Sequence, residues 1–383
     1  MNTSTCWIEI DLSAIRHNFN QVQKLIGSSA SIIAVVKANA YGHGAAAVSL
    51  ALEKENLRAL AVTKIEEARE LREAGIQKSI LLLAPILAEQ ADETVQLDLT
   101  PCVTCEADAK VLSEAAERFG KTINVHLKID TGMGRFGVNS RKAVEAAKQI
   151  AALPNLKIEG VYTHFANANT DGARPSAPQQ FHVFQTLIKP LQEQLGLAPE
   201  AFHCANSAAT LRFPQTRLQC VRVGTLLYGQ YPSAAAKNAA PNDFKLRETF
   251  CAKARIVTIK QIKTGQSVGY GSEWTAKKSA TIAIVAAGFA DGLSMEPHAR
   301  EESISQLAKS TFRRGYHALR GNDASRLVTI NGQKAPIVGR IAMQTCAIDV
   351  SNIANCKTGD EVLLPMRRLA ASALLPRVYR GED

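Results

Sequence analysis

The feature that most constrains this chain is the regular alternation of short apolar runs with longer amphipathic ones over its first two-thirds. Eight apolar runs have the length of buried strands, and helical stretches such as 64–74, 106–119, 140–152 and 177–195 lie between most of them. The strand candidates are 31–36, 59–63, 79–83, 98–103, 123–129, 157–163, 201–204 and 218–223. Strands that are apolar on both faces and joined by helices pair in parallel, so eight such units predict a β/α barrel.

The clearest helix precedes the first of these strands. Over residues 12–26 the apolar positions recur at steps of three and four, and Asp11 is placed to cap the helix. A doubly wound open sheet is the alternative to a barrel, but no G-x-G-x-x-G follows the first strand candidate. We therefore expect an eight-stranded parallel β/α (TIM) barrel within residues 1–240.

The pattern changes after about residue 240. Residues 241–383 contain short, β-rich, turn-separated segments, which predict a second, mostly β domain. These segments are 252–262, 280–287, 327–331, 334–342, 346–350 and 360–364. A polar, basic stretch at about 296–326 interrupts them, and it is either a solvated surface insertion or a basic flap near an anionic site.

Composition is that of a globular protein, with 46% hydrophobic and 21% charged residues among 383. A net charge of +10 favours anionic partners. No dense Lys/Arg block with interleaved aromatics precedes residue 300, so we expect no nucleic acid. No apolar run is long enough to span a bilayer and no signal-peptide pattern opens the chain, so we expect a cytoplasmic protein without membrane contact. Of eight cysteines only Cys102 and Cys105 form a C-x-x-C pair; without a second ligand pair we expect reduced thiols and no metal.

One lysine stands where a barrel builds its active site. Lys37 follows the first strand candidate within the segment Val35–Gly44, and the C-terminal ends of barrel strands carry the functional loops. A partly desolvated lysine has a lowered pKa and can form a Schiff base. The same position also suits a strand-end lysine that extends into solvent. The small residues and glycines around Lys37 favour the functional interpretation because they let backbone approach a ligand.

Segment 35–44 resembles the lysine signature of the alanine racemase family, whose members bind pyridoxal 5'-phosphate. Further segments resemble that family in the same order, and together they are specific although each alone is weak. They are 128–137 (KIDTGMGRFG), 163–166 (THFA), 205–208 (ANSA), 222–229 (RVGTLLYG), 269–271 (GYG), 288–292 (GFADG) and 338–343 (VGRIAM).

The resemblance implies a two-base racemase. Lys37 is expected to hold the cofactor covalently and to act as one base, and Tyr270, contributed by the second subunit of a homodimer with shared active sites, as the other. Racemisation needs such a pair, because one group removes the α-proton and another delivers it to the far side. Arg222 is expected to face the pyridine nitrogen, where a donor-only side chain keeps that nitrogen unprotonated.

The remaining site residues are also implied by the resemblance. His164 is expected beside the cofactor ring. The phosphate-binding groups are expected to be Tyr41, Ser207, Gly224 and Thr225. Arg135 and the Met343 backbone are expected to bind the substrate carboxylate. Lys128 matches a lysine that is carbamylated in some family members.

The chain departs from the family pattern at four places. Phe289 stands where a tyrosine is usual, and Gln344 stands where an aspartate usually follows the methionine. The stretch 296–326 replaces a short connection. Residues 363–383 offer no evident counterpart of a phosphate-binding tyrosine.

Three functions remain open at this stage. The first is a racemase acting on alanine or another small amino acid. The second is a specialised biosynthetic racemase or epimerase for a different amino acid, suggested by the insertion. The third is a cofactor-holding barrel with little catalysis, against which the second domain and the Gly269–Gly271 segment argue.

Overall fold

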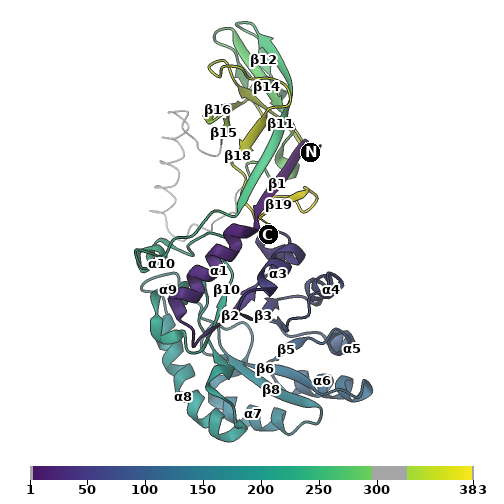
Figure 1. The fold of residues 1–383 in the computed structure, drawn as a ribbon, viewed down its shortest axis with the longest axis vertical. Coiled ribbons are helices and arrows are strands. Elements are labelled where there is room, and N and C mark those ends of the chain that lie inside the picture. Colours follow the sequence, from purple (N-terminus) through teal and green to yellow (C-terminus); the bar gives the residue numbers. More distant parts are fainter. Residues whose placement is uncertain (1–2, 296–325, 382–383) are drawn as a thin grey trace. The chain divides into compact units, whose positions relative to one another are not determined.

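The computed structural model describes residues 3–295 and 326–381, and they divide into two compact units. One unit comprises residues 11–249 with the residues from 381 onward, and the other residues 1–10 with 250–380. The predicted insertion at 296–326 lies outside the described residues except for Arg326. Figure 1 shows both units with their elements labelled.

The first unit is a near-closed parallel barrel, as the sequence predicts. Within residues 11–249 its strands follow the order β10-β2-β3-β4-β5-β6-β8-β9. They are β2 (Ser31–Val35), β3 (Leu57–Val62), β4 (Ile80–Leu82), β5 (Thr100–Val103), β6 (Ile123–Asp130), β8 (Leu156–Tyr162), β9 (Phe202–His203) and β10 (Cys220–Val223). The short β7 (Val138–Asn139) pairs with β6 outside this order.

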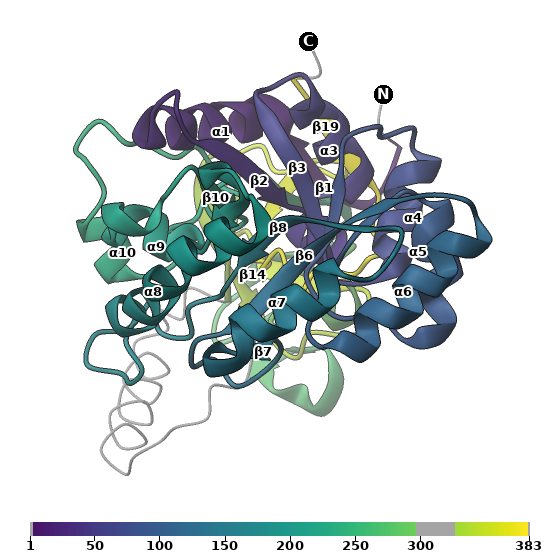
Figure 2. The same ribbon diagram turned by 90° about the horizontal axis from the view of Figure 1, so that it is seen from below.

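Helices surround these strands, as Figure 2 shows. They are α1 (Leu12–Ile26), α2 (Lys37–Gly42), α3 (Ala45–Glu53), α4 (Ile65–Glu73), α5 (Ala91–Gln96), α6 (Glu106–Arg118), α7 (Ala143–Ala151), α8 (Ala177–Leu195), α9 (Ser207–Arg212) and α10 (Ala234–Asn238). Helix α1 begins where predicted, because the Asp11 carboxylate accepts the Ala14 N–H at 2.8 Å. Its face of Ile15, Phe19 and Val22 is buried.

The barrel interior is packed by side chains from neighbouring strands. Ile33, Val35, Ala59, Ala61, Leu81 and Cys220 form one buried cluster, and Tyr41 and Leu83 pack against it. Such layers of branched and small residues fill a barrel rather than leaving a pore. Any ligand site is therefore confined to the rim, where Tyr41 and Leu83 lie.

The second unit is mostly antiparallel β structure, as predicted. In its described residues one sheet has the order β14-β17-β16-β15-β18-β11-β1-β19. These strands are β1 (Cys6–Asp11), β11 (Phe250–Ile262), β14 (Ala280–Val285), β15 (Leu327–Ile330), β16 (Gln333–Val338), β17 (Cys346–Asp349), β18 (Glu361–Leu364) and β19 (Arg377–Arg380). A small ribbon of β12 (Ser267–Val268) and β13 (Trp274–Thr275) accompanies the sheet.

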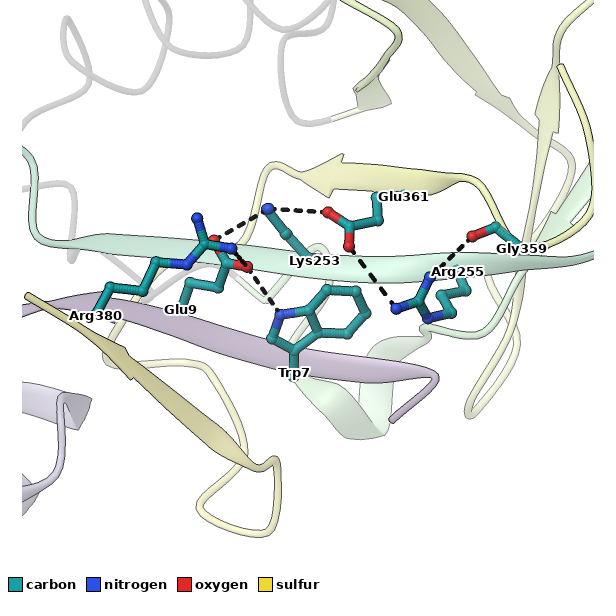
Figure 3. A network of polar contacts seen from close by, with 7 residues as sticks. All are labelled: Trp7, Glu9, Lys253, Arg255, Gly359, Glu361 and Arg380. Atoms are coloured by element: carbon teal, nitrogen blue, oxygen red, sulfur yellow. Dashed lines mark hydrogen bonds and ion pairs between the residues drawn. The ribbon is translucent and has the colours of Figure 1, made fainter. Parts of the chain in front are cut away.

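Strand β1 joins this sheet although the sequence analysis assigned residues 1–240 to the barrel domain. It pairs antiparallel with β11, in a register that sets Cys6 opposite Ala254 and Ile10 opposite Phe250. The Glu9 carboxylate then accepts from Trp7 at 3.3 Å and from Arg380 at 2.6 Å (Figure 3). Lys253 bridges Glu9 at 3.0 Å and Glu361 at 2.9 Å. Strands β1, β11, β18 and β19 thus share one polar network.

Candidate active site

A cavity of about 190 Å³ opens at the C-terminal ends of the barrel strands. Its lining comes from the segments that follow β2, β4, β8, β9 and β10. The lining residues are Val35, Lys37, Tyr41, Leu83, His164, Asn169, Asn206, Ser207, Ala208, Arg222, Gly224, Thr225 and Pro232. It therefore holds every barrel residue predicted for cofactor binding, and it lies where barrel enzymes place their sites.

Lys37 enters this cavity two residues after β2 ends. Its side chain is half-buried, and burial is the main cause that lowers the pKa of its amine, with the Arg135 charge acting in the same direction. Glu67 opposes both and raises that pKa. A lowered pKa increases the fraction of neutral amine, which is the form that attacks a carbonyl or accepts a proton.

One end of the cavity gathers hydroxyls and a backbone N–H. The Gly224 N–H donates to the Ser207 hydroxyl at 3.1 Å. The Tyr41 hydroxyl lies so close to Gly224 that a Cβ there would approach it to 2.6 Å, so a larger residue would force the tyrosine ring to move. Ser207 opens helix α9 after its Asn206 cap. Hydroxyl and backbone donors at such a turn are the groups that bind a phosphate dianion.

Arg222 is buried at the end of β10 among neutral acceptors. It donates to the carbonyls of Thr163 at 2.7 Å, His203 at 3.1 Å and Cys204 at 3.2 Å. It also contacts Nδ1 of His203 at 2.7 Å and Nδ1 of His164 at 3.3 Å. No carboxylate of the described residues forms an ion pair with it. The cation therefore faces the cavity with its charge uncompensated, which suits a ligand atom that can only accept.

Because arginine only donates, its contacts fix the tautomers of the buried histidines behind it. His203 must accept at Nδ1, so its Nε2 carries the proton and donates to Nδ1 of His126 at 3.1 Å. His126 then carries its proton on Nε2, 4.0 Å from the Glu159 carboxylate. Burial lowers the pKa of His126 to about 3 and the pKa of His203 well below its ordinary value. A Cβ on Gly160 would lie 2.5 Å from the His126 ring, so this glycine makes room for the chain of imidazoles.

Lys128 lies buried on β6 with aromatic rings around its amine. The amine is 4.9 Å from the centre of the Phe136 ring and 5.4 Å from that of Tyr162. Burial is the main cause that lowers its pKa to about 8, and Arg135 acts in the same direction. A desolvated, partly neutral amine near an arginine fits the predicted carbamylation, because a carbamate would place a negative charge near the Arg135 guanidinium.

Two other predicted residues, Tyr270 and Met343, lie in the second unit, whereas Arg135 lies in the barrel, in the loop between β6 and β7. Tyr270 follows β12 in a turn between Gly269 and Gly271, both at positive φ, and 70% of its side chain is exposed. The Arg340 guanidinium donates from Nε to Glu273 at 2.7 Å and steadies this turn. Met343 is exposed, and its carbonyl accepts the Ala290 N–H at 2.9 Å.

The two substituted positions lie close together in this unit. The Phe289 N–H donates to the Ala342 carbonyl at 3.1 Å, next to Met343 and Gln344. Phe289 is 48% exposed, and Gln344 is also exposed. Both positions therefore lie on neighbouring, exposed segments of the second unit.

Sequence reasoning missed several polar residues of the barrel site. His126, His203 and Glu67 were not singled out, because each contacts the site only through another residue. One signal was available: His126 precedes Lys128 by two positions on one strand, and alternate strand residues share a face. No comparable signal links Glu67 to Lys37, since only the fold brings them together.

Within 3–295 and 326–381 there is no group of three or more His, Cys, Asp or Glu side chains arranged to hold a metal ion. None of the helices in those ranges is long and apolar enough to cross a membrane.

Comparison with known proteins matches the whole chain. The alanine racemase N-terminal domain model matches residues 10–232 and the C-terminal domain model residues 249–373. The alanine racemase of Desulforamulus reducens is 36% identical, over 98% of this chain and 99% of that protein. The solved alanine racemase of Clostridium difficile is 30% identical with a TM-score of 0.85, covering 99% of this chain and 97% of that one. The Bacillus anthracis alanine racemase, solved with bound L-Ala-P, is 30% identical with a TM-score of 0.79, covering 100% and 97%. This chain therefore belongs to the alanine racemase family, a family of isomerases.

Proposed function

We propose that this protein is a pyridoxal-phosphate-dependent racemase that interconverts L- and D-alanine. The observation that carries the proposal is the barrel cavity, which joins a half-buried amine, a cradle of hydroxyl and backbone donors, and a buried arginine without an ion-pair partner among the described residues. The family match and the similarity to a protein solved with L-Ala-P support alanine as substrate.

The cavity residues fit the cofactor group by group. Tyr41, Ser207, Gly224 and Thr225 would hold the phosphate, and Lys37 would hold the aldehyde. His164 would lie beside the ring. The donor-only Arg222 would face the pyridine nitrogen and keep a proton off it. When bound, pyridoxal phosphate supplies the conjugated, electron-withdrawing system that acidifies the α-proton of an amino acid.

Two side chains of the protein would remove and deliver the α-proton. Inverting the α-carbon requires one group that removes its proton and a second that delivers a proton from the opposite side. Lys37 suits the first role because burial lowers its pKa. We assign the second to Tyr270 of a partner subunit in a homodimer. Arg135 and the Met343 backbone would hold the substrate carboxylate, with carbamylated Lys128 orienting Arg135.

Proton exchange tests this assignment directly. The cofactor-loaded protein is incubated with L- or D-alanine in deuterium oxide, and α-deuterium incorporation and optical rotation are followed. Both enantiomers should exchange and interconvert in the parent protein. Lys37→Ala should lose the bound-cofactor absorbance and all exchange, whereas Lys24→Ala, at an exposed lysine paired with Asp243, should retain both. Exchange that survives in Lys37→Ala would refute the assignment.

The second base, Tyr270, can be tested separately. Tyr270→Phe should slow proton removal from one enantiomer far more than from the other, because each base serves one side of the α-carbon. Equal, small effects on both enantiomers would remove Tyr270 from the reaction.

A racemase for a different amino acid is the second candidate. It is favoured by Phe289 and Gln344, which change the hydroxyl and the charge on neighbouring, exposed segments of the second unit. Running the exchange assay on a panel of small, hydroxylated and acidic amino acids separates the two candidates. A larger kcat/KM for any of these than for alanine would favour the second.

A further inference from the structure

The turn that carries Lys37 has an unusual backbone. Ala38, Asn39, Ala40 and Tyr41 are all left-handed, with φ of 52°, 53°, 50° and 55°. The left-handed helical conformation costs non-glycine residues about 1–2 kcal/mol each, and they rarely adopt it in succession. Such a conformation persists only where surrounding contacts impose it. The fold must therefore hold this turn from outside.

Side chains within the segment hold the end of the turn. The Asn39 side chain accepts the Ala45 N–H at 2.7 Å, which ties the turn to the start of α3. The His43 ring contacts the Ala40 carbonyl at 2.9 Å through Nδ1 and the Thr249 hydroxyl at 2.9 Å through Nε2. These contacts hold the end of the turn, so another group must hold its beginning at Ala38.

A carboxylate from the next β/α unit holds the beginning. One oxygen of Glu67 accepts the Ala38 N–H at 2.5 Å. Its other oxygen accepts the N–H groups of Thr63 at 2.9 Å and Lys64 at 3.0 Å. A helix start needs only the second set of bonds. Through its two oxygens, Glu67 thus links Ala38, the residue after Lys37, to the residues that follow strand β3.

Glu67 also balances the charge around the amine. The charged groups that act on Lys37 are Arg135, from the loop after β6, and Glu67, from α4. His164, after β8, faces the same amine and is neutral, because burial holds its pKa well below the ordinary value. Of these three groups, only Glu67 favours the protonated amine.

We propose that Glu67 is a positioning residue for Lys37, whose carboxylate fixes the left-handed turn presenting the amine to the cavity and offsets the positive charge around it. The proposal deepens the function proposed above, because it concerns the amine which that function uses. Its geometry involves barrel residues alone and requires no bound group.

Glu67→Gln tests the electrostatic half in the cofactor-free chain. Glutamine keeps the shape and one acceptor oxygen but removes the charge. Acetic anhydride reacts only with neutral amines, so the pH dependence of Lys37 acetylation, read by peptide mass spectrometry, reports the pKa of that amine. The midpoint should move down by roughly half a unit or more, since a nearby opposite charge shifts a pKa by about one unit. Glu66→Gln, at an exposed carboxylate in the same helical turn, should leave it unchanged.

Glu67→Ala tests the positioning half. Hydrogen exchange at the Ala38 and Ala40 amides should quicken by about tenfold or more, while amides in α3 keep their protection. An unchanged or raised midpoint in Glu67→Gln, or unchanged exchange in Glu67→Ala, would overturn the proposal and leave Glu67 as a cap of α4 only.

Both readouts are independent of racemisation. If they behave as expected and no amino acid exchanges its α-proton, the proposed function fails and the role of Glu67 stands. If they fail while Lys37→Ala abolishes exchange, the function stands and the role of Glu67 does not.

Discussion

At the scale of single residues, burial lowers the pKa values of several ionisable groups in the barrel. His126, His203 and Lys128 all have pKa values lowered chiefly by desolvation. Burial also lowers the pKa of Arg222, but a guanidinium keeps its proton even when buried. Arg222 thus keeps a fixed positive charge at the site, and the neutral imidazoles serve as acceptors and donors of fixed direction.

The imidazole chain makes a prediction about acid stability. The pKa of His126 is about 3 in the folded protein and 6.5 ordinarily, so between these values only the unfolded chain binds the proton. Its contribution to stability is therefore full above pH 6.5 and is lost as the pH falls toward 3. In the cofactor-free protein, His126→Gln should lose unfolding free energy less steeply than the parent between about pH 7 and pH 5. Urea titrations at each pH measure this free energy. If it fell equally steeply with pH in His126→Gln and in the parent, His126 would not be a buried neutral imidazole.

The lowered pKa of Lys128 leads to a prediction about stability at alkaline pH. Its amine has a pKa of about 8 in the folded protein against 10.5 ordinarily, so stability should rise as the pH increases between these values. In buffer freed of carbon dioxide, Lys128→Met should abolish that part of the rise. Restoring bicarbonate should stabilise the parent but not the variant, and mass spectrometry under native conditions should detect the added carboxyl group. If bicarbonate also stabilised Lys128→Met, the carbamylated residue would not be Lys128.

At the scale of elements, patterning specified the regular structure. Helix α1 has the predicted bounds, and each predicted barrel strand overlaps an observed one, because buried parallel strands are continuous apolar runs. Strand β1 was missed because its partner β11 begins at residue 250, and no local pattern links segments so far apart in the sequence. The left-handed turn was also missed, because alanine and tyrosine carry no local preference for it and Glu67 is distant in sequence.

That turn yields a stability prediction. Ala38→Gly should raise the free energy of unfolding by about 0.5–1 kcal/mol, because relief of the left-handed conformation outweighs the greater flexibility of glycine when unfolded. Ala47→Gly, in the right-handed helix α3, should lower it by about 1 kcal/mol. Denaturant midpoints at constant m-value measure both. Destabilisation of the two variants to the same extent would mean that residue 38 is not strained.

At the scale of the whole molecule, the polar network of Figure 3 joins four strands of the second unit. The side chains of Lys253 and Glu9 are only 14% and 11% exposed. Lys253→Ala should destabilise the protein by roughly 1–3 kcal/mol, because it leaves two carboxylates without their shared cation. Lys24→Ala, at an exposed pair, should change stability little. Equal effects of the two substitutions would show that the network contributes no more than a surface contact.

The sequence predicted the barrel cavity more completely than the second unit. Lys37, Arg222 and the phosphate cradle follow strands whose ends converge in any barrel, so their meeting could be anticipated. Tyr270 and Met343 lie on turns whose relation to the barrel is not encoded in any periodic pattern. Their roles therefore remain proposals, and so does the homodimer.

The placement of β1 has a consequence for biosynthesis. The strand leaves the ribosome before the barrel that follows it, yet the strands that flank it in the sheet, β11 and β19, begin at residues 250 and 377. Domains generally fold as they emerge, so the intervening barrel can form while this apolar ribbon waits unpaired. During that interval the backbone hydrogen-bonding groups of β1 are unpaired on the nascent chain, and a chaperone that binds Cys6–Asp11 would protect them from pairing with other strands.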